Sequence, residues 1–185
     1  MKYVYLMTKN KGKIAAAQSV FDKYGIEVRS LDFDVPEIQA DTSIEIAKNM
    51  VIQAFEKFKE PVIREDHSLF IDEIHFPGPF MAFAEKSISA EKLSTMIKNL
   101  DSTNGHFELS AAFCDRNGVC HEFSYSVPVV FETNPKGVPS DGWNQLIRFP
   151  DENRVFTEYP SNERNHIWAK NYEEIAKLIS SELRL

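Results

Sequence analysis

The sequence has few cysteines, no excess of basic residues and no long apolar run, and each of these absences excludes a class of protein. Cys114 and Cys120 are the only cysteines among 185 residues. They could face each other across a short hairpin, but we expect two free thiols in a reducing cytoplasm. Lys and Arg number 21 against 28 Asp and Glu, so a nucleic-acid-binding protein is not expected. No apolar run approaches the roughly 18 residues of a membrane span, and no signal peptide is recognisable, so we expect neither a membrane nor a secreted protein.

Three familiar catalytic signatures are absent as well. The histidines never fall at the i, i+4 spacing of a helical zinc site, so a zinc enzyme is not expected. No G-x-S-x-G elbow supports a serine hydrolase, and no G-x-x-x-x-G-K-[ST] segment supports a Walker A site. The dispersed histidines are His67, His75, His106, His121 and His166.

What the chain does have is the composition of an ordinary globular protein, 43% hydrophobic and 26% charged. Its length predicts a single domain with a good core. Alternating aromatic and β-branched residues indicate strands, whereas apolar residues at helical spacing indicate helices that bury one face. In the first half, these patterns predict strands over 2–7, 26–33 and 61–64 and helices over 14–25 and 43–59.

The second half changes character. Residues 106–133 predict two long strands joined by the turn 115–118, because Asn-Gly tolerates positive φ. A helix is predicted over about 89–100 and another over 162–183, with a loop-rich stretch before it that reaches about 160. Helices beside strands, followed by a long hairpin, predict a mixed sheet in an α/β fold whose two lobes could enclose a cleft.

The basic segment TKNKGK, residues 8–13, lies between a predicted strand and a predicted helix. A helix N-terminus carries partial positive charge, so its backbone amides together with Lys11 or Lys13 could hold a phosphate. The alternative is an exposed basic turn that only keeps the protein soluble.

Three carboxylates, Glu37, Glu65 and Asp66, follow this basic loop in sequence. Mg²⁺ prefers oxygen ligands and often takes one or two carboxylates plus substrate phosphates. A carboxylate beside that metal could also orient or deprotonate an attacking water. The alternative is that Glu65 and Asp66 mark the end of a strand where the chain meets water. The order of basic loop, acidic loop and acidic pair favours the functional interpretation.

Five segments in order along nearly the whole chain then carry a resemblance to one family. They are TKNKGK (8–13), VPEIQ (35–39), IREDHSLFIDEIHFPGPF (63–80), PKGVPSDGW (135–143) and PSNERN (160–165). Together they resemble the motifs of the inosine triphosphate pyrophosphatase family, enzymes that cleave deaminated purine nucleoside triphosphates. The first looks like the family's T-G-N-x-x-K phosphate loop, with Lys9 in place of the glycine.

The resemblance implies roles for the phosphate side of the site. Glu37 matches the glutamate of the family's L-P-E segment, which helps to bind Mg²⁺, and Asp66 falls at the catalytic and metal-binding position. Glu65 and Lys13 are expected to join Asp66 in catalysis. The residues expected to bind the phosphates are Thr8, Asn10, Lys11, Lys13 and Lys48.

The base side departs from the family's pattern. Asn144 stands where the family has an acid, and Arg164 stands where it has a lysine. Residues 168–170, Trp-Ala-Lys, replace a Ser-His-Arg trio that reads the purine. A site that loses its hydrogen-bonding groups also loses discrimination. The base-side contacts that the resemblance still implies are His67, Gly142, Trp143, Asn144, Arg164 and Lys170, with Trp143 stacked on the base.

The resemblance implies an elongated mixed sheet with flanking helices, in which residues 1–185 form one two-lobed domain with the nucleotide in a central cleft. It also implies a homodimer, and the missing membrane span and signal peptide lead us to expect it in the cytoplasm. We expect an Mg²⁺-dependent hydrolase that converts a nucleoside triphosphate such as ITP, XTP or a deoxy form to the monophosphate and pyrophosphate. Two alternatives stay open: a nucleotide-binding protein that has lost turnover, and a pyrophosphatase for a pyrimidine or modified base.

Overall fold

The computed structural model describes residues 2–160 and 163–182, and the chain divides into two compact units. The first unit holds the residues up to Asp66, Leu109–Tyr125 and the residues from Asn165 on. The second unit holds His67–Glu108 and Ser126–Arg164. That the two form the single domain predicted for residues 1–185 stays a prediction.

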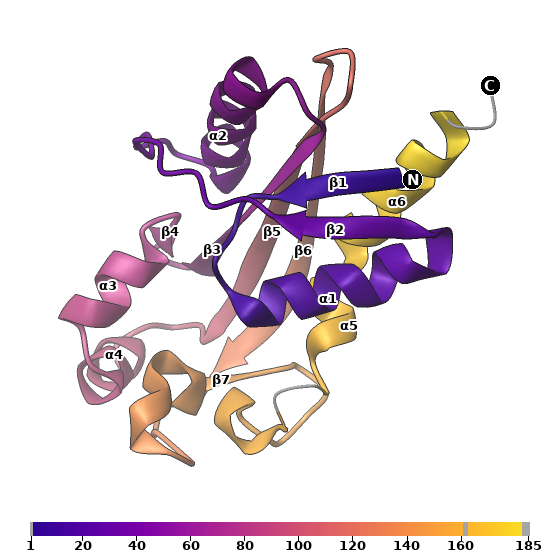
Figure 1. The fold of residues 1–185 in the computed structure, drawn as a ribbon. Helices are drawn as coiled ribbons and strands as arrows, with labels where there is room; N and C mark the ends of the chain where they lie inside the picture. Colours follow the sequence, from indigo (N-terminus) through magenta and orange to yellow (C-terminus); the bar gives the residue numbers. More distant parts are fainter. Residues whose placement is uncertain (1, 161–162, 183–185) are drawn as a thin grey trace. The chain divides into compact units, whose positions relative to one another are not determined.

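The described strands form a seven-stranded sheet in the order β2-β1-β3-β5-β6-β7, with β4 paired to β3 (Figure 1). The strand β1 runs parallel to β2 and β3, whereas β4 is antiparallel to β3 and β7 is antiparallel to β6. The predicted mixed α/β sheet with flanking helices is therefore confirmed. The bounds are β1 Lys2–Leu6, β2 Ile26–Ser30, β3 Val62–Ile71, β4 Phe76–Gly78, β5 Asn104–Cys114, β6 Cys120–Phe131 and β7 Ile147–Arg148.

Two layers of helices cover the sheet of the first unit. Val62 belongs to a core cluster with α2, whereas the next residue, Ile63, belongs to a cluster with α1 and α6. Successive side chains of a strand point to opposite faces, so α2 covers one face and α1 with α6 covers the other. The helices of this unit are α1 Lys11–Phe21, η1 Asp22–Tyr24, α2 Ser43–Phe58, α5 Asn165–Trp168 and α6 Lys170–Glu182.

The first helix begins earlier than its apolar pattern predicts. The side chain of Asn10 caps α1 by accepting from the backbone N–H groups of Gly12 and Lys13, a capping role in which asparagine is among the strongest residues. The helix therefore starts at Lys11 instead of Ile14. As a result, Lys11 and Lys13 lie in the first helical turn and not in a loop.

The third strand is longer than predicted. We expected it over 61–64, but β3 continues to Ile71 because its second half pairs with β4. Glu65 and Asp66 thus lie in the middle of a strand, and the interpretation of the acidic pair as a strand end is wrong.

The helix predicted over 162–183 is also interrupted. Within the described residues it divides into α5 and α6 at Ala169. Positions 161–162 and 183 of the predicted segments lie outside the described residues.

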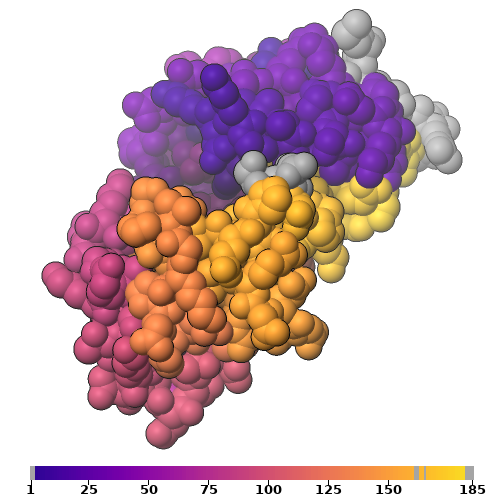
Figure 2. All heavy atoms as spheres, turned by 90° about the horizontal axis from the view of Figure 1, so that it is seen from below, coloured from indigo at the N-terminus to yellow at the C-terminus, as the bar shows by residue number. Residues whose placement is uncertain are grey.

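The second unit combines short helices with the far half of the hairpin. Its helices are α3 Met81–Ser87, α4 Ala90–Ile97, η2 Pro139–Gln145 and η3 Phe156–Glu158. Ser89 caps α4 as its sequence predicts, whereas α3 was not predicted. In Figure 2, η2 and η3 lie next to one another at the surface of this unit, in orange tones.

The predicted hairpin is confirmed at the turn between β5 and β6. Gly118 has a φ of 81° and donates its backbone N–H to the carbonyl of Asp115 at 3.1 Å, which is the positive-φ geometry expected of the Asn-Gly turn. Cys114 and Cys120 flank the turn as free thiols, as expected. None of the described helices has the length and apolar character needed to cross a membrane.

Candidate phosphate site

The N-terminus of α1 is organised by Asn10. Its Oδ1 accepts from the N–H of Gly12 at 2.8 Å and from that of Lys13 at 3.2 Å, while the backbone N–H of Asn10 donates to Oγ1 of Thr8 at 3.2 Å. Because Oδ1 is fully engaged with the helix, the side-chain N–H₂ group of Asn10 is left to donate away from it. Among the amides predicted to hold phosphate, those of Thr8, Asn10 and Gly12 are already bonded within the chain, and Asn10 presents a side-chain donor beside them.

Lys13 lies close to a buried carboxylate. Its Nζ is 3.9 Å from Oε2 of Glu65, and the two side chains are 29% and 3% exposed. Tyr172, from α6, donates its hydroxyl hydrogen to the same Oε2. Burial, reinforced by the charge of Glu65, holds the pKa of Tyr172 well above its usual value. The tyrosine is therefore a neutral donor at any physiological pH.

Adjacent positions on β3 send the two predicted acids to opposite faces. Glu65 lies on the face of Ile63, where Tyr172 contacts it. Asp66 follows the alternation of Val62 and Arg64 and belongs to the other face. The pair therefore does not act as one two-carboxylate unit, although both residues lie in the first unit with Lys13.

Glu37 is tied to the same face of β3 as Asp66. Arg64 donates from Nη2 to Oε2 of Glu37 at 3.2 Å and from Nη1 to the carbonyl of Met7 at 3.0 Å. The Glu37 side chain is 52% exposed, so it stays accessible from solvent. The arginine thus fixes the acidic loop against the strand that carries Asp66.

The other predicted lysines are placed as follows. Lys9, at the glycine position of the family loop, pairs with Asp32 at 2.8 Å, and hydrogen bonding to Asp32 raises the pKa of Lys9. Lys48 pairs with Glu122 at 2.6 Å, so it reaches a phosphate only by leaving that partner. The Nζ of Lys170 lies 5.0 Å from the ring centroid of Tyr125. The exposed Lys11 lies on the first turn of α1 with Lys13.

In the second unit, the segment predicted to hold the base is part of the core. Trp143 is only 2% exposed, and its Nε1 donates to the carbonyl of Ile88 at 2.8 Å. Its backbone N–H donates to Oε1 of Glu85, also at 2.8 Å. Gly142 has a φ of 58°, and a Cβ there would lie 2.2 Å from the same Glu85 oxygen. At 2% exposure the ring could meet a base only by leaving this packing, so the expected stacking of Trp143 on a base stays a prediction.

The remaining residues predicted for the base side are Arg164, Asn144 and His67, all half-buried. The guanidinium of Arg164 lies 4.5 Å from the ring centroid of Phe156, and burial lowers the pKa of Arg164. Its Nε is buried and meets no hydrogen-bond partner within the described part of the chain. These residues share a unit with Trp143, whereas Lys170 belongs to the first unit.

Sequence reasoning missed Arg64, Tyr172 and Glu85. Tyr172 falls on the apolar stripe of α6 with Ile175 and Ile179, which predicts a core residue and nothing more. The signal available was its hydroxyl, since a buried tyrosine hydroxyl needs a partner. Arg64 offered a similar signal as a lone cation in an apolar strand, which is costly to bury unpaired.

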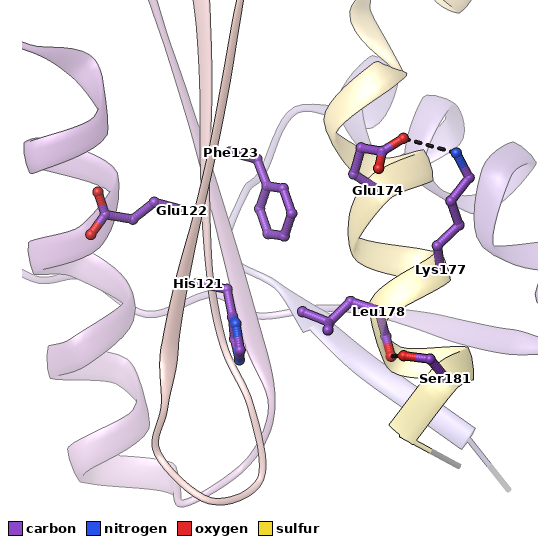
Figure 3. A pocket seen from close by; sticks show the side chains of 7 residues that line it. All are labelled: His121, Glu122, Phe123, Glu174, Lys177, Leu178 and Ser181. Carbon is purple, nitrogen blue, oxygen red and sulfur yellow. Dashed lines mark hydrogen bonds and ion pairs between the residues drawn. The ribbon is translucent and has the colours of Figure 1, made fainter. Parts of the chain in front are cut away.

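A groove of about 520 Å³ lies in the first unit between β6 and α6 (Figure 3). Its polar groups satisfy one another or nearby residues: Lys177 pairs with Glu174, His121 pairs with Asp115, and Ser181 donates to the carbonyl of Leu178. None of the predicted site residues lines it. The lining residues are His121, Glu122, Phe123, Glu174, Lys177, Leu178 and Ser181.

Comparison with protein families and with curated proteins finds relatives that match most of this chain. Residues 4–172 match the family model of the Ham1 family. The chain is 29% identical over 162 residues to the dITP/XTP pyrophosphatase of Methanopyrus kandleri, covering 87% of this chain and 86% of that protein. It is 27% identical over 167 residues to inosine triphosphate pyrophosphatase 1 of Trypanosoma cruzi, covering 89% and 84%.

Solved structures agree on the fold. A HAM1 protein from Coxiella burnetii superposes with a TM-score of 0.83 at 19% identity, over 98% of this chain and all of that one. The Staphylococcus aureus Ham1 protein gives a TM-score of 0.76 at 19% identity, over 99% and 98%. These structures share the fold of this chain.

Proposed function

Because the chain belongs to the Ham1 family, we propose that it is a nucleoside triphosphate pyrophosphatase that uses Mg²⁺ and releases a nucleoside monophosphate and pyrophosphate. Curated relatives in two organisms carry pyrophosphatase names for dITP, XTP or inosine triphosphate. A deaminated purine nucleotide is accordingly the substrate we propose. The observation that carries the proposal is the start of α1, where Asn10 and Lys13 present donors beside the buried Glu65.

The phosphate chain is bound at the first turn of α1 in this proposal. Asn10 donates from its side-chain amide, and Lys11 and Lys13 supply positive charge at the positive end of the helix dipole. Thr8 acts through Asn10, because Oγ1 of Thr8 accepts a hydrogen bond from the backbone N–H of Asn10. These fixed positive charges stabilise the negative charge of the phosphoryl group that is transferred. Such electrostatic stabilisation is a main contribution of a protein to phosphoryl transfer.

The residues present fit Mg²⁺ held jointly by protein and substrate. No group of three or more His, Cys, Asp or Glu side chains that could hold a metal occurs in the described part of the chain, which argues against a cage built by the protein alone. Glu37, fixed by Arg64 beside the strand of Asp66, and Asp66 itself would be the protein ligands, as one or two carboxylates suffice for Mg²⁺. When bound, the ion supplies charge neutralisation at the phosphate oxygens.

Asp66 orients the attacking water and takes its proton. The water oxygen forms a bond to the α-phosphorus while the bond from that phosphorus to the α–β bridging oxygen breaks, and pyrophosphate leaves. Lys13 neutralises charge on the phosphates through this step. Glu65 contributes by holding Lys13, since it lies on the face opposite to Asp66.

The test is a panel of nucleoside triphosphates, including ITP, XTP, dUTP and modified pyrimidines, incubated with the purified protein and Mg²⁺ while pyrophosphate is measured. We expect release with ITP or XTP and a loss of at least about a hundredfold in kcat for Asp66→Asn, the usual scale for a lost general base. The exposed Asp101→Asn is the matched control and should retain turnover. Full turnover in Asp66→Asn would contradict the mechanism.

The same panel separates two alternatives that a specific observation supports. The buried Trp143 and the Trp-Ala-Lys segment at 168–170 remove groups expected to read a purine. A preference for a pyrimidine or modified base would show that the base site has changed, and binding without pyrophosphate release would show a binding protein. The homodimer is likewise proposed from the resemblance, and light scattering of the purified protein measures it.

A further inference from the structure

Tyr172 lies in the first turn of α6, 1% exposed, and donates its hydroxyl hydrogen to Oε2 of Glu65. We propose that Tyr172 is a positioning residue: its hydroxyl fixes the carboxylate of Glu65 at the point from which that carboxylate holds Lys13 for the phosphate chain of the substrate. The inference rests on the proposed function, because it assigns Lys13 to that phosphate chain.

The contact geometry at a single oxygen carries the argument. Oε2 of Glu65 is the atom that accepts from Tyr172 and also the atom nearest to Nζ of Lys13, at 3.9 Å. At that separation the ammonium is attracted by the carboxylate but is not committed to a hydrogen bond with it. Its N–H groups can therefore donate to phosphate oxygens, while the attraction restrains its flexible stem.

Glu65 needs such a partner because it is almost completely buried. A buried carboxylate with too few donors is costly, and a side chain that can turn away would release Lys13. Tyr172 supplies a donor whose own position is rigid, since its ring packs against Phe21 with centroids 6.2 Å apart. The next residue back, Asn171, donates from Nδ2 to the carbonyl of Leu109 at 3.0 Å and fixes the same turn of α6 to β5.

The charged and titratable groups around Tyr172 come from each element packed on it. Glu65 and Arg64 act on it from β3, and Tyr125 acts on it from β6. Lys13 lies beyond Glu65 on α1. Burial raises the pKa of Tyr125, so neither tyrosine ionises near neutral pH, and the hydroxyl of Tyr172 acts as a donor throughout.

A second tyrosine–carboxylate pair provides a matched control, because its carboxylate belongs to Glu173, the residue that follows Tyr172 on α6. Tyr24 donates its hydroxyl hydrogen to Oε1 of Glu173, so it too joins the α1 side of the unit to α6 through a carboxylate. Tyr24 lies past the C-terminal end of α1, in η1, away from the turn that carries Lys13. Tyr24→Phe therefore removes the same chemical group without touching the phosphate end.

The first measurement is binding of inorganic tripolyphosphate by calorimetry to the wild type, Tyr172→Phe and Tyr24→Phe, with thermal unfolding measured in parallel. We expect Tyr172→Phe to weaken binding roughly tenfold, the scale of a lost hydrogen bond to a charged group, and Tyr24→Phe to bind as the wild type does. Equal affinity in Tyr172→Phe and wild type, or equal losses in the two variants, would overturn the inference.

A second measurement distinguishes positioning from general damage. If Tyr172 acts through Lys13, Tyr172→Phe should cost no further affinity in a Lys13→Met background, whereas a structural defect would add to the loss. Glu65→Gln keeps an acceptor for Tyr172 but removes the charge that holds Lys13, and it should lose as much affinity as Tyr172→Phe. Should Tyr172→Phe fail to fold, Glu65→Gln decides, and wild-type affinity in that variant overturns the inference.

The two proposals fail in different ways. If the wild type binds tripolyphosphate but releases no pyrophosphate from any nucleotide, the proposed function is wrong. The comparison of Tyr172→Phe with and without Lys13→Met still tests the role of Tyr172 in that case. A wild type that releases pyrophosphate while Tyr172→Phe matches it in kcat, KM and affinity defeats the inference alone. A wild type that does not bind tripolyphosphate also defeats the inference, since Lys13 would then hold no phosphate chain.

Discussion

At the scale of single residues, Asn10 combines two tasks that usually fall to different groups. Its Oδ1 closes the N-terminus of α1 by accepting from Gly12 and Lys13, and its N–H₂ group faces away as a donor. One carboxamide thus stabilises the helix through its oxygen and is proposed to bind the ligand through its N–H₂ group. A substitution that keeps only one of these two groups separates the two roles.

Asn10→Asp and Asn10→Ala should behave in opposite ways. Aspartate caps as well as asparagine, so Asn10→Asp should keep the stability of the fold, but its charge repels a phosphate chain and should lower tripolyphosphate affinity by more than about tenfold. Asn10→Ala should lower the free energy of unfolding by about 1 kcal/mol. Denaturant unfolding and calorimetry measure the two effects.

Asn153→Asp, at an exposed position of the second unit, is the control for the added negative charge. It should leave both unfolding and tripolyphosphate binding as in the wild type. Wild-type affinity in Asn10→Asp would show that this side chain does not meet the phosphate chain.

At the scale of elements, the β5–β6 hairpin is held by one buried carboxylate at its turn. Oδ1 of Asp115 accepts from the backbone N–H groups of Asn117 at 2.8 Å and Val119 at 3.0 Å, and Oδ2 meets His121 at 3.0 Å. Burial by itself would raise the pKa of Asp115, but the hydrogen bonds from His121 and the backbone outweigh it and lower the pKa. The ionised form is therefore the one that stabilises the turn.

Asp115→Ala should lower the free energy of unfolding by about 1–3 kcal/mol at pH 7, because two backbone donors lose their acceptor. A depressed carboxyl pKa gives stability that is present above the unfolded-state value and is lost as pH falls through the folded-state value. The difference between the wild type and Asp115→Ala should therefore shrink below about pH 4. Denaturant unfolding at several pH values measures it, with Asp101→Ala as an exposed control. A difference that grows on acidification would contradict the assignment.

Elements with strong local patterns were predictable, and those that depend on distant partners were not. The start of α4 at its Ser89 cap and the turn at Asn117 and Gly118 follow from local chemistry, and the structure has both. The second half of β3 was missed because His67 and Ser68 are polar, and the strand continues through them by pairing with β4 and β5, which are distant partners in the sheet.

The residue types of the site were predictable from the sequence, but the directions in which their side chains point were not. Motif order selected Lys13, Glu65 and Asp66, but a strand thought to end at residue 64 gave no reason to expect opposite faces. The burial of Trp143 depends on Glu85 and Ile88, which lie more than fifty residues away along the chain. No local pattern carries that information.

At the scale of the whole molecule, the fold and the proposed chemistry should respond differently to loss of divalent cations. A chelator should reduce pyrophosphate release to background while the melting temperature stays the same, because no group of three metal-binding side chains occurs within residues 2–160 and 163–182. A weakly held ion adds little to stability by mass action. Turnover assays and thermal unfolding with and without chelator measure this, and added Mg²⁺ should restore turnover. Full turnover in chelator would contradict the proposed cofactor.

The boundary between the two units falls inside β3, between Asp66 and His67. Every residue proposed for phosphate and metal lies before that boundary, whereas Arg164 and Asn144 belong to the unit after it. A substitution at Arg164 or Asn144 therefore leaves the Asn10 cap and the Lys13–Glu65 pair with all their partners. In evolutionary terms, if Arg164 and Asn144 meet the base as the resemblance implies, the lineage could change which base it accepts, one substitution at a time, and keep the proposed phosphate-binding residues intact throughout.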